Sequence, residues 1–156
     1  MKILVIDDDA ALCRSLQIHL ERGGHSVELA HNASDGIARY GEDNFDLAFV
    51  DLKLPDKSGL EVLKAIQQSG ANGLAVMITG TQDMKATIEA VRLGAFDYIR
   101  KPLDLDAVLL TVEKVAQERS RVTGKKKLSA DAEFQPHEFV GGSLKTIEVI
   151  KQIGLL

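Results

Sequence analysis

Three aspartates in this chain directly follow short apolar segments that are typical of buried β-strands. Asp7 and Asp8 come after residues 2–6 (KILVI), and Asp51 comes after residues 45–50 (FDLAFV). Because the carboxyl ends of neighbouring parallel strands meet at one edge of a sheet, we expect these carboxylates to converge there. Crowded carboxylates repel one another unless a cation lies among them, and a site made only of oxygen ligands suits Mg²⁺. The spacing therefore predicts a small metal site beside Asp51, a carboxylate that could attack a phosphoryl group.

Two further polar residues stand at the ends of later strand-like segments. Thr79 ends residues 74–79 (LAVMIT), and Lys101 follows residues 95–99 (AFDYI). A hydroxyl at Thr79 could donate to a phosphoryl oxygen, and Lys101 offers a compact positive charge for the same oxygens. Cis bonds are about 5–6% of X-Pro bonds in folded proteins, so the unaided expectation for Lys101-Pro102 is trans. A cis bond would nevertheless turn Lys101 towards the acids.

The elements that must position these residues alternate regularly along the chain. Strands are expected at residues 2–6, 26–30, 45–50, 74–79 and 95–99, and helices at 10–22, 34–40, 59–69, 83–93 and from 104 onward. Helix starts are indicated by Asp9, by Asn32 or Ser34, and by Asp83, whereas Gly23-Gly24 and Gly94 indicate helix ends. The alternation predicts a flavodoxin-like (βα)5 fold, a doubly wound parallel sheet in the order 2-1-3-4-5.

Composition limits the functions open to the chain. It has 156 residues, 45% of them hydrophobic, and a net charge of −4, so its overall charge does not favour binding to nucleic acid or to an anionic membrane. No apolar run is long enough to span a bilayer, and MKILVIDDD is unlike a signal peptide. Cys13 is the single cysteine, expected in the core; no internal disulfide is possible, which fits a cytoplasmic location.

The last predicted helix is longer than the sheet requires. An apolar stripe with 3-4 spacing runs along it, with Arg119 in one stripe position, through Leu105, Val108, Val112, Val115 and Val122. This stripe either packs on the sheet in its first half or pairs with a second copy of the chain. Residues 123–138 (TGKKKLSADAEFQPHE) are polar, contain Gly and Pro, and are interpreted as a linker.

At this point the sequence resembles the receiver domain of two-component response regulators. The matching motifs are the Asp7-Asp8 pair, Asp51 opening DLKLPDKSGLEVL, MITG with Thr79, and LGAFDYIRKP with Tyr98 and Lys101. The resemblance covers residues 1 to about 121.

The resemblance implies that Asp51 accepts a phosphoryl group from the phosphohistidine of a sensor histidine kinase. It implies that Asp7, Asp8, Asp51 and the backbone carbonyl of Lys53 hold Mg²⁺, and that the Lys101-Pro102 bond is cis. Thr79 and Lys101 would bind the phosphoryl oxygens. Thr79 and Tyr98 would form the switch, with Thr79 moving towards the phosphate and Tyr98 turning inward. In such receivers the positions of Lys53 and Thr81 tune the lifetime of the phosphate.

The C-terminal segment resembles a different family. FVGGSLKTIEVIKQIGLL is similar to the opening of the AAA+ domain of sigma-54-dependent (NtrC-type) activators, through Phe139, Val140, Gly141 and Ser143. The expected organisation is a receiver at 1–121, a linker at 122–138 and the start of a truncated AAA+ domain at 139–156. The resemblance implies homodimers through the fifth helix and linker. It also implies sigma-54 RNA polymerase and DNA as partners of the full-length protein, though not through this fragment. No membrane partner is expected, and no phosphate-binding Gly-Lys-Ser/Thr loop follows.

The expected role is a signalling switch that catalyses only its own phosphorylation and dephosphorylation, not a metabolic enzyme. A stand-alone receiver is one alternative. A second is a haloacid-dehalogenase-type phosphatase, because Asp7 and Asp9 have the Asp-x-Asp spacing of that family, although Ala11 stands where its threonine should be. A third is a flavodoxin-like cofactor carrier, which is disfavoured because three acids in the first loop would repel a phosphate.

Overall fold

The structure is a computed structural model that describes residues 1–80 and 82–129, with residues 123–129 as backbone only. Thr81 lies outside the described residues. So do residues 130–156, which include most of the expected linker and the segment that resembles the start of an AAA+ domain.

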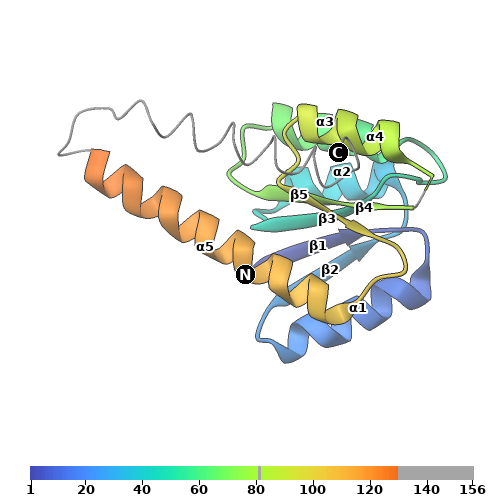
Figure 1. Cartoon of the computed structure of the whole chain (residues 1–156), viewed down its shortest axis with the longest axis horizontal. Coiled ribbons are helices and arrows are strands. Elements are labelled where there is room, and N and C mark those ends of the chain that lie inside the picture. The colour runs from blue at the N-terminus through green and yellow to red at the C-terminus, as the bar shows by residue number, and fades with distance from the viewer. Residues whose placement is uncertain (81, 130–156) are drawn as a thin grey trace.

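Five parallel strands form one sheet in the order β2-β1-β3-β4-β5, and a helix follows each strand (Figure 1). The strands are β1 (Lys2–Ile6), β2 (Ser26–Ala30), β3 (Leu47–Asp51), β4 (Leu74–Thr79) and β5 (Asp97–Arg100). The helices are α1 (Ala10–Arg22), α2 (Ala33–Glu42), α3 (Gly59–Gln68), α4 (Met84–Arg92) and α5 (Leu105–Ser129). The predicted fold class and strand order are confirmed. The switch in strand order lies between β1 and β3, the two strands that end at the aspartates.

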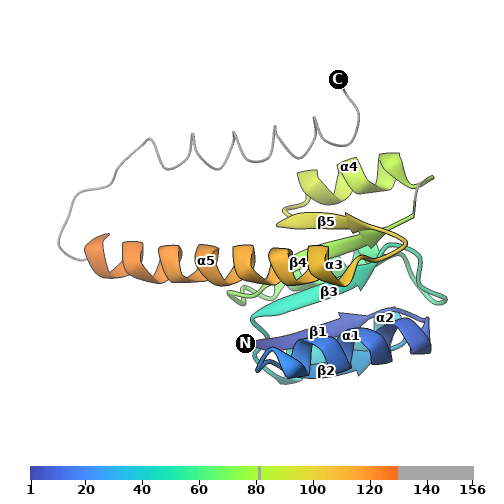
Figure 2. The ribbon, with the colours of Figure 1, turned by 60° about the horizontal axis from the view of Figure 1, so that its bottom comes forward.

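Helices cover both faces of the sheet, α1 and α5 on one side and α2, α3 and α4 on the other (Figures 1 and 2). Strand β1 is buried on both faces because its alternating side chains enter different cores. Ile3 and Val5 join a core that α1 and α5 complete with Cys13, Leu16, Leu20, Val108, Val112 and Val115. Leu4 and Ile6 join a core that α2, α3 and α4 complete with Ala33, Tyr40, Val62, Leu63, Ile66 and Ala90.

Most of the predicted helix starts are confirmed by capping hydrogen bonds. The Asp9 carboxylate accepts from the Leu12 amide at 3.1 Å, and the Asn32 side chain accepts from the Asp35 amide at 2.7 Å. Asp83 occupies the N-cap position of α4, but its side chain makes no capping hydrogen bond. The prediction that it caps this helix therefore holds for its position and not for its chemistry.

The fifth strand is shifted along the chain relative to the prediction of 95–99. It spans Asp97–Arg100, and Arg100 pairs with Thr79 of β4. Lys101 lies just beyond it, where its amide donates to the Thr79 carbonyl at 2.8 Å. The following Lys101-Pro102 peptide bond is cis, as the resemblance implied.

Helix α5 continues past the expected end of the domain at residue 121. It runs to Ser129, so the first part of the predicted linker at 122–138 is helical (Figure 2). The single Gly124 costs a helix only about 1 kcal/mol, and the next proline is Pro136, so nothing in this stretch forces the helix to end. Despite its length, neither α5 nor another helix within the described residues has the apolar span needed to cross a membrane.

The apolar stripe of α5 is largely used within the domain. Val108, Val112 and Val115 are almost fully buried against the sheet, whereas Val122 is 42% exposed. Arg119, which the sequence places in the stripe, instead binds the body of the domain. Its guanidinium lies 2.8 Å from the Asp46 carboxylate and donates to the Asn72 carbonyl at 2.7 Å.

Candidate functional site

The three aspartates predicted to converge do lie together at the carboxyl edge of the sheet. Asp7, Asp8 and Asp51 each offer a carboxylate oxygen, and these oxygens all lie within 4.8 Å of one another. Asp7 is fully buried, Asp51 is 5% exposed, and Asp8 is open to solvent. Two carboxylates of the cluster are therefore buried, and a ligand can approach from the side of Asp8.

Backbone amides fix the two buried carboxylates. The Asp9 amide donates to Asp7 Oδ1 at 2.9 Å, and the Lys53 amide donates to Asp51 Oδ1 at 3.1 Å. In both cases the donor lies two residues beyond the aspartate, because the chain turns sharply as it leaves the strand. The second oxygen of each carboxylate, Oδ2, accepts no hydrogen bond from these amides.

Lys101 reaches both of these second oxygens. Its Nζ lies 3.0 Å from Asp51 Oδ2 and 3.2 Å from Asp7 Oδ2. Burial acts to lower the pKa of Lys101, but the hydrogen bond to Asp51 and the charges of Asp51 and Asp7 outweigh it, so the pKa is raised. Lys101 is therefore a fixed positive charge within the cluster.

One ammonium does not balance three carboxylates. Burial, together with the charge of Asp51, raises the pKa of Asp7 despite the opposing effects of the Asp9 amide and Lys101. Although Asp7 Oδ2 lies near Lys101, it has no well-directed hydrogen bond. A buried, under-coordinated oxygen among excess negative charges fits a small divalent cation, and the all-oxygen donor set fits Mg²⁺. The carbonyl of Lys53 stays a predicted ligand.

Replacing Asp7 with asparagine is expected to stabilise the fold when divalent cations are removed. At pH 7 the buried charge of Asp7 is unfavourable in the folded state, since its pKa is raised there. Removing it should increase the free energy of unfolding by about 1 kcal/mol in urea titrations with EDTA. Added Mg²⁺ should then stabilise the wild type more than the variant. Asp9→Asn, at the same edge but outside the cluster, is the control; a loss of stability in Asp7→Asn would contradict the assignment.

Thr79 lies at the end of β4, but its hydroxyl forms hydrogen bonds with groups outside the acid cluster. Its Oγ1 is 2.9 Å from Oγ1 of Thr87 in α4 and 3.1 Å from the Gly80 carbonyl oxygen. Thr87 was missed from the sequence, where a threonine inside a helix carries little signal. Its place four residues after Asp83 was the available clue, because threonine hydroxyls often bond the carbonyl one turn back. Tyr98 of β5, the other predicted switch residue, is partly buried and packs beside Val91 of α4.

Two other residues near this edge have structural roles. Asp9 is engaged in capping α1, so the Asp-x-Asp arrangement of a haloacid-dehalogenase-type phosphatase is not realised by its side chain. The thiol of Cys13 is buried and donates to the Asp7 carbonyl at 3.2 Å. Burial and the charges of Asp7 and Asp9 raise the pKa of Cys13 to about 12, which makes it an unreactive core residue.

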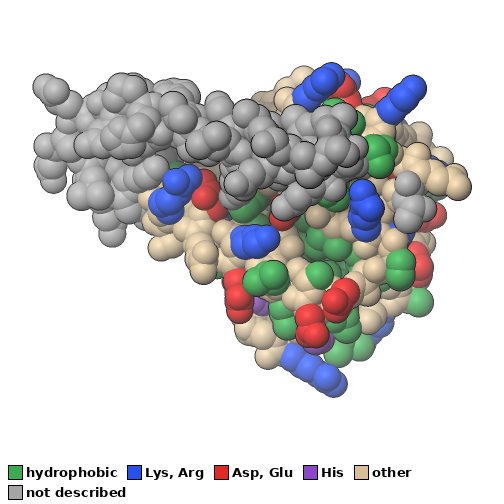
Figure 3. Space-filling model, viewed as in Figure 1, with side chains coloured by type: hydrophobic (Ala, Val, Ile, Leu, Met, Phe, Trp, Pro, Cys, Tyr) green, Lys and Arg blue, Asp and Glu red, His purple; other side chains and the backbone are tan. Residues whose placement is uncertain are grey.

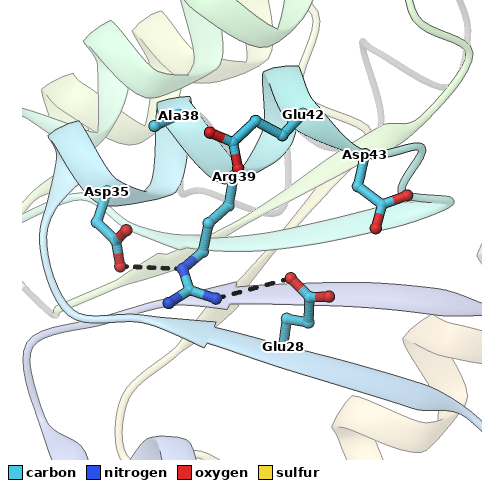
Figure 4. A pocket seen from close by; sticks show the side chains of 6 residues that line it. All are labelled: Glu28, Asp35, Ala38, Arg39, Glu42 and Asp43. Atoms are coloured by element: carbon cyan, nitrogen blue, oxygen red, sulfur yellow. Dashed lines mark hydrogen bonds and ion pairs between the residues drawn. The ribbon is translucent and has the colours of Figure 1, made fainter.

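A separate hollow of about 450 Å³ lies between the edge strand β2 and helix α2 (Figure 4). It is lined by Glu28, Asp35, Ala38, Arg39, Glu42 and Asp43. The Arg39 guanidinium spans it, 3.1 Å from Asp35 and 3.8 Å from Glu28. On the face in Figure 3, basic side chains of the described residues are likewise interspersed with acidic ones. Charges that pair across the hollow make it a weaker candidate than the acid cluster.

The sequence and the fold are similar to those of known proteins. Residues 3–113 match the family model of the response regulator receiver domain. The chain belongs to this family. It is 36% identical over 130 residues to the transcriptional regulatory protein ZraR of Salmonella typhimurium, covering 83% of this chain and 29% of ZraR. The present chain thus spans less than a third of that relative.

Solved structures of the family have the same fold. A response regulator receiver domain protein from Clostridium thermocellum superposes with a TM-score of 0.73 at 28% identity, covering 78% of this chain and 98% of that one. NtrX from Brucella abortus, solved in complex with ADP, gives a TM-score of 0.74 at 28% identity. That match covers 86% of this chain and 30% of NtrX. The receiver is therefore similar both to isolated domains and to the receiver part of a longer protein.

Proposed function

We propose that Asp51 is the phosphoacceptor of this receiver and that a sensor histidine kinase is its phosphodonor. The proposal rests mainly on one observation: Asp51 lies in an acid cluster, yet Lys101 binds its free oxygen at 3.0 Å. A carboxylate oxygen of Asp51 attacks the phosphorus of the phosphohistidine, and the phosphorus–nitrogen bond breaks. The imidazole leaves with the bonding electron pair and takes up a proton.

Asp7, Asp8, Asp51 and the Lys53 carbonyl are the proposed ligands of Mg²⁺. When bound, this ion neutralises the negative charge that builds up between an attacking carboxylate and a phosphoryl group. Lys101 adds a second positive charge, which we propose moves from Asp51 Oδ2 to a phosphoryl oxygen once Asp51 is modified. Hydrolysis of the aspartyl-phosphate at the same site would reset the switch, so the chain acts only on its own phosphoryl group.

The proposed response to phosphorylation involves Thr79 and Tyr98. The Thr79 hydroxyl donates to a phosphoryl oxygen, and Tyr98 turns into the space that Thr79 vacates. In the unphosphorylated state both residues contact α4: Thr79 bonds to Thr87, and Tyr98 packs beside Val91. A local change of charge at Asp51 is thereby passed to α4 and β5.

The proposed output is a change in self-association that controls an attached sigma-54-dependent (NtrC-type) transcription activator. Support comes from α5, in which Val122 is 42% exposed and which continues to Ser129, beyond the body of the domain (Figure 2). Similarity to ZraR, whose name identifies a transcriptional regulator, favours the same setting. In this proposal the receiver is cytoplasmic and forms homodimers through α5 and the linker. Sigma-54 RNA polymerase and DNA are contacted by other parts of the full-length protein.

One phosphorylation titration tests both parts of the proposal. The chain is incubated with phosphoramidate and Mg²⁺, and intact mass and solution molecular weight are measured on the same samples. We expect one phosphate per chain and a shift in the monomer–dimer balance that follows the labelled fraction. A chain ending at Arg121 should take up the same phosphate without the shift. Absence of labelling would overturn the phosphoacceptor role, whereas labelling without a change in molecular weight would overturn only the dimer.

A further inference from the structure

The Thr79 hydroxyl is hydrogen-bonded to a buried residue, Thr87, that lies outside the receiver motifs. Thr79 is 2% exposed and Thr87 is 3% exposed, and their Oγ1 atoms are 2.9 Å apart. Thr87 Oγ1 also donates to the Asp83 carbonyl, one helical turn back, at 2.8 Å. Burying a hydroxyl costs free energy unless it is hydrogen-bonded, so this contact stabilises the unphosphorylated conformation.

The number of protons fixes the direction of these bonds. Each threonine hydroxyl has one proton to donate. Since Thr87 gives its proton to Asp83, the short contact between the two threonines requires the proton of Thr79. Thr79 therefore donates to Thr87, and the Gly80 carbonyl, 3.1 Å from Thr79 Oγ1, is a second acceptor within reach of the same proton. A phosphoryl oxygen on Asp51 must compete with these acceptors for that same proton.

The start of α4 depends on the same group. The Asp83 carboxylate does not cap the helix; its Oδ1 lies 3.5 Å from Nζ of Lys53, in the loop after β3. The Asp83 carbonyl accepts both the amide of Thr87, at 2.9 Å, and its hydroxyl. The Thr79–Thr87 contact thus joins the end of β4 to the first turn of α4.

We propose that Thr87 is a positioning residue that holds Thr79 in the unphosphorylated conformation. This inference rests on the proposed phosphoacceptor function and adds to it. The hydrogen bond to the Thr87 hydroxyl stabilises the unphosphorylated position of Thr79. A phosphoryl oxygen on Asp51 must therefore replace this bond before Thr79 can move. Removing that hydroxyl leaves Thr79 with fewer competing acceptors and shifts the equilibrium towards the phosphoryl-bound conformation.

The test measures the affinity for beryllofluoride, a phosphoryl mimic, in the presence of Mg²⁺ by calorimetry. Thr87→Val, which is close in shape and lacks the hydroxyl, should bind about two- to tenfold more tightly than wild type, the effect of one neutral hydrogen bond. Thr87→Ser should keep the wild-type affinity, because it restores the hydroxyl. Thr87→Ala provides a second removal of the hydroxyl should the valine variant fold poorly.

Thr111 supplies a matched control in the same chain. It is 5% exposed, and its Oγ1 also donates one turn back, to the Ala107 carbonyl at 3.0 Å, but in α5 and without contact to Thr79. Thr111→Val should therefore leave beryllofluoride affinity unchanged. In a Thr79→Val background, Thr87→Val should have no further effect, since the two hydroxyls act as a pair.

The outcomes separate this inference from the proposed function. If wild type takes up phosphate and binds beryllofluoride but Thr87→Val and Thr87→Ala bind it no more tightly, the role of Thr87 is wrong. The same conclusion follows if the gain persists in the Thr79→Val background. If wild type neither takes up phosphate nor binds beryllofluoride, the phosphoacceptor function itself is wrong, and this inference is overturned with it.

Discussion

Replacement of Asp51 by asparagine is expected to reduce phosphate incorporation from one equivalent per chain to none. An amide oxygen is a poor nucleophile, and the acid cluster loses the carboxylate that Lys101 binds at 3.0 Å. Asparagine is close in size to aspartate and can keep the hydrogen bond from the Lys53 amide, so the loop should retain its shape. Intact mass after incubation with phosphoramidate and Mg²⁺ measures the effect directly.

Asp9→Asn is the matched control for this experiment. Asp9 lies at the same edge of the sheet and is exposed, but it caps α1 instead of joining the cluster. Asparagine is as good an N-cap as aspartate, so α1 should be unaffected. This variant should be labelled as fully as wild type. Full labelling of Asp51→Asn, or its loss in Asp9→Asn, would contradict the assignment of Asp51.

The second large effect is expected at Gly59, the first residue of α3. A Cβ atom built there would lie 2.2 Å from the Asp51 carbonyl oxygen and 2.8 Å from Leu52 Cα, both backbone atoms. The Gly59 amide also donates to the Leu52 carbonyl at 2.9 Å, which holds α3 against the end of β3. Gly59→Ala must therefore displace either α3 or the strand end that carries Asp51.

We expect Gly59→Ala to lower the free energy of unfolding by about 3 kcal/mol, at the upper end for overpacking of a buried site. Urea unfolding monitored by circular dichroism measures this. Gly41→Ala in α2 is the control, because a Cβ there would meet no atom within 4 Å. It should stabilise the helix by about 0.5–1 kcal/mol. Equal stabilities of the two variants would show that the backbone at Gly59 yields without cost.

Features encoded in short segments were predictable from the sequence. Strand β1 and Asp9 each carry their signal in a few neighbouring residues, an apolar run in one case and a capping position in the other. The convergence of Asp7, Asp8 and Asp51 then followed from strand order alone, because a parallel sheet brings its strand ends together.

Side-chain contacts between distant segments were not predictable in this way. Asp56, in the loop after β3, accepts hydrogen bonds from the amides of Ala33 and Ser34 at 2.8 and 2.9 Å, and nothing near Asp56 in the sequence points to α2. Thr87 is a similar case, since its partner belongs to another element. Such pairings depend on how helices are placed over the sheet, which residue spacing within one helix does not specify.

Arg119 shows what the periodicity of a helix can and cannot predict. A charged residue in an otherwise apolar stripe indicates that it has a specific partner. The stripe was expected either to pack on the sheet in its first half or to pair with a second copy of the chain. The valines before Arg119 do pack on the sheet, and Arg119 binds Asp46. Periodicity identifies the face of a helix that is covered, but it does not identify what covers it.

The position of this Arg119 contact determines where α5 can pivot. Asp46 and Asn72 precede β3 and β4, so this anchor of the helix is at the opposite end of the strands from Asp51. From Arg119 to Ser129 the helix runs for about 15 Å, at 1.5 Å per residue, so this stretch would act as a lever if α5 tilted at the anchor. A tilt of about 10° at the anchor would move its tip by about 3 Å, so small rearrangements in the domain reach the end of the lever enlarged.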